Sequence, residues 1–206
     1  MKLDHVRRVI AFGAHPDDVE VGAGGLVAKL VAAGAQVTIV VSSIPNQYAM
    51  RRAEAIAAAA KLGAALVLPP GDETGARVEE TPMHALVARF EREIATVDPE
   101  LVLVHGAHDS HHDHIAVHRA VLAALRRTRC DILAYATRLP AGVSPPPPTC
   151  IVDISSTIDT KLAAIAEHKS QFPPDFPEKR RDIHRALGIT HGLPFAEVYE
   201  VLRMEL

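Results

Sequence analysis

The sequence predicts an α/β fold, built as one domain around a mostly parallel sheet. Short apolar runs alternate with Ala-rich stretches of helical composition along the chain, which is the pattern of repeated βαβ units. Hydrophobic residues make up 48% of the 206 residues but aromatic residues only 4%, so the core consists mainly of Ala, Val, Leu and Ile. A core of this kind suits helices packed on a buried sheet, and the length suits a single domain, residues 1–206.

The strands are predicted from runs rich in Val, Ile and Leu. In chain order these runs are residues 9–12, 36–42, 65–68, 101–104, 132–135, 149–154 and 198–204. Right-handed βαβ connections join the first five into a Rossmann-like, doubly wound sheet of order about 3-2-1-4-5, with extra strands at the end and helices on both faces. In this order the crevice that binds ligands lies between the first and fourth strands.

The helices are placed by their stop and start signals. Gly34 and Gly63 each follow an Ala-rich stretch and end it, and Thr81 with Pro82 is typical of a helix start. We expect helices at residues 24–33, 51–62, 81–96, 115–127, 158–168 and 181–187. Two Pro-rich segments, residues 145–148 and 172–177, either border a site or simply cross the surface.

Composition argues against several classes of protein. The net charge is −3 with no basic stripe, so no nucleic-acid partner is expected. No run approaches 18 apolar residues and no apolar leader opens the chain, so we expect no membrane span and a cytoplasmic location. Cys130 and Cys150 have no metal-like spacing and are expected to be buried thiols, with a disulfide between them left open. A homo-oligomer is also left open.

The string that follows the first strand carries an imidazole and two carboxylates, His15, Asp17 and Asp18. Pro16 stiffens this turn, and the adjacent aspartates should point in different directions. One of them can then bind a metal while the other stays available as a base. The alternative is an Asx-type turn that caps a helix.

A second polar cluster follows the fourth strand. Six of the twelve histidines fall here: His105, His108, His111, His112, His114 and His118. The predicted strand order brings this cluster beside His15, which makes the purely structural alternative less favourable. His111 and His114 share one side of a helix start, and one of them completes a two-His, one-carboxylate set with His15 and Asp18. Zinc accepts such a set, and Fe²⁺ is possible. We expect His112 to face away, and the other three to be surface or packing residues.

These motifs together resemble one known family. The string from His15 to Glu20, followed by Gly24-Gly25, resembles the signature of the PIG-L/LmbE-like zinc N-deacetylases. Residues 111–114 resemble that family's His-Pro-Asp-His motif, with His112 where Pro is usual. Residues 51–54, the segment from Lys161 to Gln171 and residues 195–197 resemble its remaining motifs, in the same order. The nearest type is the bacterial thiol-sugar deacetylases, such as those that make bacillithiol, although the stretch after Gln171 is shorter here.

The resemblance implies specific roles. It implies zinc bound by His15, Asp18 and His114, and Asp17 as the general base on the metal-bound water. It also implies that His111, held by Asp113 or Asp109, stabilises the oxyanion or protonates the leaving amine. The catalytic set is thus Asp17, His111 and Asp113, and the substrate contacts are Arg51, His168 and Asp109. Glu20 is expected to be a structural partner, and Asp72 is a weaker candidate for the site.

The expected function is removal of an acetyl group from an N-acetylglucosamine-type sugar or its conjugate, a small-molecule substrate. Two alternatives stay open. Gly22-Ala23-Gly24-Gly25 suggests a nucleotide-binding Rossmann-like module, but the His15 turn occupies the position of the phosphate loop. A non-catalytic metal-binding protein is the other, and it would need neither Asp17 nor His111.

Overall fold

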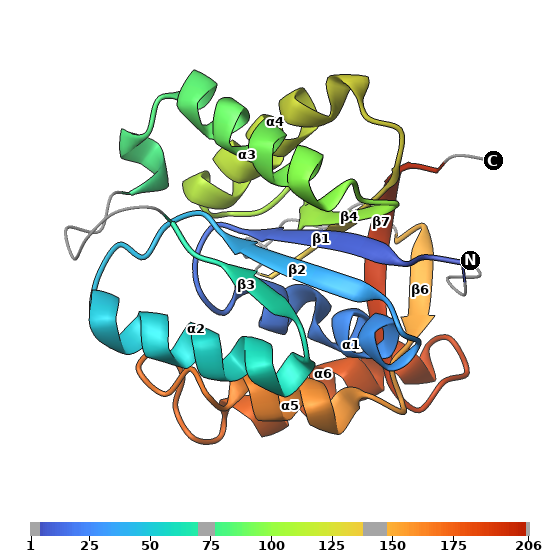
Figure 1. The fold of residues 1–206 in the computed structure, drawn as a ribbon. Coiled ribbons are helices and arrows are strands. Elements are labelled where there is room, and N and C mark those ends of the chain that lie inside the picture. Colours follow the sequence, from blue (N-terminus) through green and yellow to red (C-terminus); the bar gives the residue numbers. More distant parts are fainter. Residues whose placement is uncertain (1–4, 70–76, 138–147, 205–206) are drawn as a thin grey trace.

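The computed structural model describes residues 5–69, 77–137 and 148–204. Its seven strands form one sheet of order β3-β2-β1-β4-β5-β7-β6 (Figure 1). The strands are β1 Arg8–Gly13, β2 Gln36–Val41, β3 Ala65–Val67, β4 Leu101–His105, β5 Asp131–Tyr135, β6 Cys150–Asp153 and β7 Ala196–Arg203. The first five pair in parallel, which confirms the predicted order 3-2-1-4-5. The extra strands β7 and β6 extend the β5 edge and pair antiparallel.

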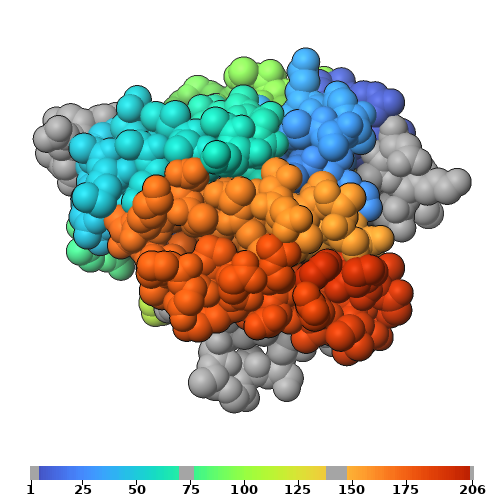
Figure 2. All heavy atoms as spheres, turned by 90° about the horizontal axis from the view of Figure 1, so that it is seen from below, coloured from blue at the N-terminus to red at the C-terminus, as the bar shows by residue number. Residues whose placement is uncertain are grey.

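Helices cover both faces of the sheet, as predicted. The α-helices are α1 Asp18–Ala32, α2 Tyr48–Leu62, α3 Met83–Val97, α4 His112–Ala124, α5 Ile158–Ile165 and α6 Phe176–Ile189. In Figure 1, α3 and α4 lie on one face and the other four lie on the opposite face. Figure 2 looks onto that second face, where α2, α5 and α6 lie side by side.

Two apolar layers, one on each side of the sheet, make up the core. Strand residues point alternately into the two layers, because side chains of a strand alternate between its faces. Val9 and Ala11 of β1 join the layer under α1 and α5, whereas Ile10 and Phe12 join the layer under α3 and α4. All four are fully buried, as expected for a central parallel strand.

Several predicted helix boundaries are wrong. The first helix begins at Asp18 rather than Gly24, because Asp18 and Glu20 in its first turn suit the positive end of the helix dipole. Helix α4 begins at His112 rather than Ile115 and ends at Ala124, where a 3₁₀ turn continues the chain. Helix α5 stops at Ile165, and α6 is longer than expected at both ends. A 3₁₀ turn, Val78–Glu80, was not predicted.

The glycines of the first helix serve packing. A Cβ atom at Gly22 would lie 2.1 Å from Cδ2 of Tyr135, and one at Gly25 would lie 2.8 Å from a methyl carbon of Ile154. Both glycines are buried inside α1, away from its N-terminus. They let the helix approach the sheet and the segment after β6, and they do not form a phosphate-binding loop.

Other expectations concern the cysteines, the membrane and the loops. Cys130 and Cys150 are buried, as expected, and both are free thiols, which answers the question of a disulfide that the sequence left open. Within the described ranges, no helix has the length and apolar character needed to cross a membrane.

Asp72 and most of the 145–148 segment lie outside the described residues. In the other Pro-rich segment, the rings of Phe172 and Phe176 stack with centroids 4.0 Å apart.

A Gly22→Ala variant tests the packing of α1. Replacing Gly by Ala inside a helix ordinarily stabilises it by about 0.5–1 kcal/mol. Here the new methyl group would overlap Tyr135, whose buried hydroxyl donates to the Phe12 carbonyl at 2.7 Å and fixes the ring. We expect the free energy of unfolding to fall by about 1–3 kcal/mol, measured by urea denaturation.

Gly24→Ala is the matched control, because the atom nearest to its new Cβ, Cγ of Lys161, would lie 3.2 Å away and not 2.1 Å. It should change stability much less. Equal stability of Gly22→Ala and the unchanged protein would contradict the close contact with Tyr135.

Candidate active site

The turn between β1 and α1 is held from several sides. The backbone N–H of His15 donates to Oδ2 of Asp18 at 2.8 Å, and that of Ala14 donates to Nε2 of His105 at 3.1 Å. Asp17 takes a φ of 97°, in the left-handed region that Asp tolerates better than most residues. The carboxylates of Asp17 and Asp18 have different partners: Asp17 contacts Arg51, whereas Asp18 contacts His105 and His114.

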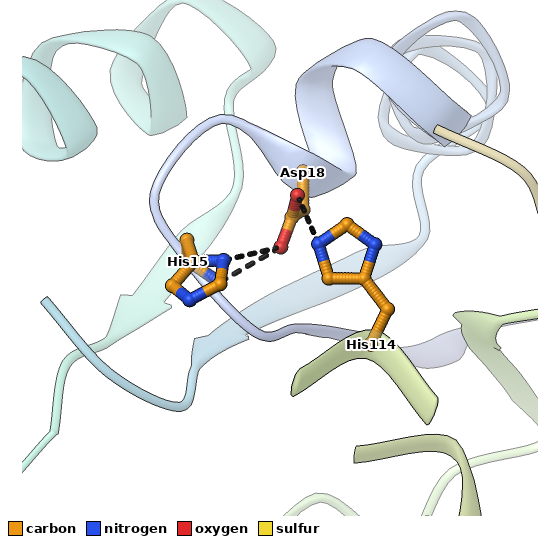
Figure 3. A group of neighbouring side chains, drawn as sticks. All are labelled: His15, Asp18 and His114. Carbon is orange, nitrogen blue, oxygen red and sulfur yellow. Dashed lines mark hydrogen bonds and ion pairs between the residues drawn. The ribbon is translucent and has the colours of Figure 1, made fainter. Parts of the chain in front are cut away.

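His15 from the turn after β1 and His114 from α4 converge on Asp18 at the start of α1 (Figure 3). One potential ligand atom each from His15, Asp18 and His114 lie within 4.8 Å of one another. Nε2 of His114 is 3.2 Å from Oδ1 of Asp18, and Nδ1 of His15 is 3.7 Å from Oδ2. All three residues are buried. The first and fourth strands therefore bring together the set that the sequence suggested.

Behind this set lies a layer of supporting groups. Oδ2 of Asp109 is 2.9 Å from Nδ1 of His114 and accepts from the Thr137 hydroxyl at 3.0 Å. Burial disfavours charge, but the hydrogen bonds with Asp109 and Asp18 dominate and raise the pKa of His114 to about 10. Asp109 was expected at the substrate, whereas the structure places its carboxylate behind His114.

His105 is a functional neighbour that sequence reasoning missed. It was expected only to pack or to lie on the surface, and it is indeed fully buried. However, its Nε2 lies 3.3 Å from Oδ2 of Asp18, and its ring stacks on His114 with centroids 4.0 Å apart. Its place at the end of β4, level with the His15 turn, was the available signal. His118 in turn bonds the His105 carbonyl through Nδ1 at 2.7 Å.

Asp113 is placed differently from its expected position. Its Oδ2 lies 2.9 Å from Nε2 of His15, so this carboxylate contacts a residue of the converging set and not the His111 ring. Nδ1 of His111 instead accepts the backbone N–H of Asp113 at 3.2 Å, as the cap of α4. The backbone N–H of His111 donates to Asp109 at 2.9 Å.

Described donor atoms also meet in two further groups, His15–His111–Asp113 and His105–Asp109–His114. Both share a histidine with the converging set. The three groups of donor atoms therefore overlap in one neighbourhood, with His15 and His114 at its centre.

His111 and His112 lie on the open side of this neighbourhood. The His111 ring stacks on that of His114 at 4.7 Å and meets the His15 ring edge-on at 5.0 Å. His112 is exposed, and it borders a neighbouring polar cavity of about 380 Å³ together with His111 and Arg77. The two histidines thus diverge, although both stay near the same opening.

Arg51 lies in the first turn of α2 and is buried against the His15 turn. Its Nη2 is 3.4 Å from Oδ2 of Asp17 and donates to the Pro16 carbonyl at 3.3 Å, while Nη1 donates to Oδ1 of Asn46 at 3.1 Å. Burial and the charge of Asp18 raise the pKa of Asp17 to about 8, against the opposing effects of His168 and Arg51.

A cavity of about 690 Å³ opens over these groups. It is lined by the converging set, Asp17, Arg51 and His111, and on its other side by the C-terminal segment, including Phe172 and Arg180. His168 was expected to border it, but its ring is fully buried and its Nε2 lies 3.5 Å from Glu20. Glu20 thus has the structural partner that was expected of it.

The raised pKa of Asp17 predicts a pH-dependent stability in metal-free protein. Because this pKa lies above the value of about 3.9 in the unfolded chain, the folded state holds the proton more tightly, and stability falls as the pH rises from about 4 to 8. Asp17→Asn cannot titrate and should remove this part of the decline, at most about 1.4 kcal/mol per pH unit. Urea denaturation with a chelator at several pH values measures it.

Asp159→Asn serves as control, since that side chain is 84% exposed. A profile for Asp17→Asn that runs parallel to the unchanged protein would contradict the raised pKa.

Comparison with known proteins supports the resemblance noted in the sequence. Residues 10–125 match the family model described as PIG-L, GlcNAc-PI de-N-acetylase. An uncharacterised deacetylase of Escherichia coli, YaiS, is 31% identical over 170 residues, covering 79% of this chain and 90% of its own length. The diacetylchitobiose deacetylase of Thermococcus kodakarensis is 26% identical over 212 residues, covering 92% of this chain and 79% of its own.

One solved structure has the same fold at low sequence identity. GalB, the 4-carboxy-2-hydroxymuconate hydratase of Pseudomonas putida, superposes with a TM-score of 0.81 at 21% identity, covering 97% of this chain and 98% of its own. At that identity the likeness shows the fold alone. The family match spans more than half of the chain and includes both polar clusters, so this protein belongs to the PIG-L family.

Proposed function

We propose that the protein is a metal-dependent N-deacetylase that releases acetate from an N-acetylated amino sugar or its conjugate. One observation carries the proposal: a buried two-His, one-Asp set lies beside a separate carboxylate, Asp17, and an exposed imidazole, His111, on one cavity. Metal-assisted amide hydrolysis needs these parts together. The family match and the relatives named deacetylases agree with it.

His15, Asp18 and His114 are the residues that would hold the metal. Their donor types, two imidazoles and one carboxylate, suit zinc with positions left open, and Fe²⁺ accepts the same set. Burial lowers the pKa of His15, which favours the neutral ring that a metal requires. Asp109 and Asp113 contact the remaining ring nitrogens of His114 and His15, as carboxylates behind metal-binding histidines commonly do. When bound, the metal would lower the pKa of water and polarise the amide carbonyl.

Asp17 is assigned the role of general base. Its carboxylate is in the cavity but is not one of the three converging groups, so it is available to accept a proton from the attacking water. Arg51 contacts it at 3.4 Å and would hold it in place.

His111 is assigned the role of hydrogen-bond donor to the oxyanion. Because its Nδ1 accepts the backbone N–H of Asp113, the neutral ring carries its proton on Nε2. That N–H would stabilise the oxyanion, and the proton that Asp17 takes from water would pass to the leaving nitrogen. The C–N bond breaks as the water oxygen becomes part of acetate, and the amine leaves with the proton it has gained.

Two measurements test the proposal. Elemental analysis of the purified protein should find about one zinc per chain. Incubation with N,N'-diacetylchitobiose and other N-acetylglucosamine conjugates should release acetate, and a chelator should stop the release. Metal without acetate release from any of them would favour the non-catalytic alternative, and nucleotide binding without metal would favour the Rossmann-like module.

Asp17→Asn tests the general base. The amide keeps the shape and tolerates the left-handed backbone, but it cannot accept the proton. The rate of acetate release should fall by roughly 10²–10⁴-fold, measured under saturating substrate. Zinc content should stay near that of the unchanged protein. If Asp17→Asn lost its zinc while Asp18→Asn kept it, the two aspartates would have exchanged roles.

His111→Ala, compared with His112→Ala, tests the hydrogen-bond donor to the oxyanion. Loss of the His111 imidazole should leave zinc bound but slow turnover by roughly 10²–10³-fold, the usual effect of removing one oxyanion donor. His112→Ala should change turnover little, because His112 does not line the 690 Å³ cavity over the converging set, whereas His111 does. Equal loss of activity in the two variants would show that this assignment is wrong.

A further inference from the structure

The active-site cavity has a second cationic group that the reaction does not use. Among the described residues, two arginines line it: Arg51, in the first turn of α2, and Arg180, on α6. Arg180 comes from the C-terminal segment, which also contributes the stacked rings of Phe172 and Phe176 to the cavity wall. No sequence motif singled out Arg180.

Arg180 forms few polar contacts with the described residues around it. One nitrogen, Nη2, donates to the Val21 carbonyl at 3.2 Å. Its Nε is buried and has no hydrogen-bond partner among the described residues, and no described carboxylate lies within 4.0 Å of the guanidinium. Burial lowers the pKa of Arg180, and the charge of Glu197 opposes that effect. A half-buried guanidinium in this state has hydrogen-bonding capacity left for a ligand.

A purely structural role for Arg180 is poorly supported. Glu197, the nearby acid, already has a cation in contact, since Nζ of Lys161 lies 2.5 Å from Oε1. Its other hydrogen bonds come from the Tyr199 hydroxyl and the backbone N–H groups of Gly25 and Leu26. The Val21 carbonyl that Arg180 contacts also accepts from Lys161, at 2.8 Å. Neither group depends on Arg180.

The other cavity arginine is already engaged. Nη2 of Arg51 has its acceptors in the His15 turn, one of them the carboxylate of Asp17, and Nη1 donates to Asn46. The Nε of Arg51 is likewise buried without a partner among the described residues. Binding a substrate anion through Arg51 would disturb the contact that holds the proposed base. Arg180 has no such second duty.

We propose that Arg180 is a specificity-determining residue that binds an anionic group, a carboxylate or a phosphate, on the substrate. The acetylated sugar would then carry a negative charge at the end that lies along the C-terminal segment. The acetylated sugar in this inference rests on the proposed function, whereas the anionic group is inferred from the surroundings of Arg180. A guanidinium offers paired N–H groups that match both carboxylate and phosphate, and such bonds are stronger where water is partly excluded.

The test uses three matched glycosides of N-acetylglucosamine, with O-methyl, O-carboxymethyl or phosphate at the anomeric carbon. Binding to the metal-loaded protein is measured by calorimetry and turnover by acetate release. The two charged ligands should bind roughly 10- to 100-fold more tightly than the methyl glycoside, the range expected for hydrogen bonds to charged groups. The carboxymethyl and phosphate arms show which anion the site prefers.

Arg180→Gln should remove this preference and leave binding of the methyl glycoside within about twofold. Arg180→Lys keeps the charge without the paired geometry and should restore part of it. Arg181→Gln is the matched control, because the neighbouring Arg181 pairs with Asp159 at 2.9 Å and Glu178 at 3.0 Å. It should keep the full preference. Thermal unfolding of each variant confirms that it is folded.

Each possible result either supports or overturns the anion site at Arg180. Equal binding of the three ligands to the unchanged protein would overturn the inference, even if all three were deacetylated. A preference that survives in Arg180→Gln would also overturn it, and would point to direct binding of the anion by the metal or by Arg51. Conversely, Arg180-dependent binding of charged ligands without any acetate release would support the anion site and refute the proposed deacetylase.

Discussion

The buried carboxylate of Asp18 is the group on which the site depends. It accepts the His15 backbone N–H at 2.8 Å and lies within 3.3 Å of both His105 and His114. It therefore joins the turn after β1, the end of β4 and the helix α4. Burial would disfavour its charge, but these partners, His105 foremost, hold the pKa of Asp18 well below its usual range. Without this charge, three buried imidazoles would lose their common partner.

Sheet order and the convergence of the two polar clusters were predictable, because they follow from strong patterns. The apolar runs of the central strands are continuous, and the rule for the crevice of a doubly wound sheet then places His15 beside His114. The start of the first helix was not predictable in the same way. Gly24-Gly25 resembles an interruption of a helix, yet glycines inside α1 are required by close contacts with Tyr135 and Ile154. Such contacts are tertiary and leave no local signal.

Within the site, residue types were easier to predict than partners. The sequence identified Asp109 and Asp113 as relevant and expected one of them to hold the His111 ring, whereas their carboxylates contact the rings of His114 and His15. Asp109 reaches His111 only through its backbone N–H. The cap of α4 explains the difference: the His111 ring turns back onto the Asp113 backbone, and this frees the carboxylate to reach across to β1. The roles of His105 and Arg180 were still harder to predict from the sequence. Each is defined by tertiary contacts, those of a fully buried ring and of a side chain on α6, which leave no local sequence signal.

Charge is distributed unevenly around the cavity, and this has a consequence for how a substrate would lie. The side built by the turn after β1 carries Asp17 and Asp18, whose charge the positive end of the α1 dipole and nearby Arg51 partly offset. The side built by the C-terminal segment carries Arg180 instead, without a carboxylate in contact within the described chain. Of the protein's own charged groups, those on the second side are the ones that attract an anionic substituent. With the neutral amide beside Asp17, this uneven distribution of charge would orient the anionic end of the substrate toward Arg180.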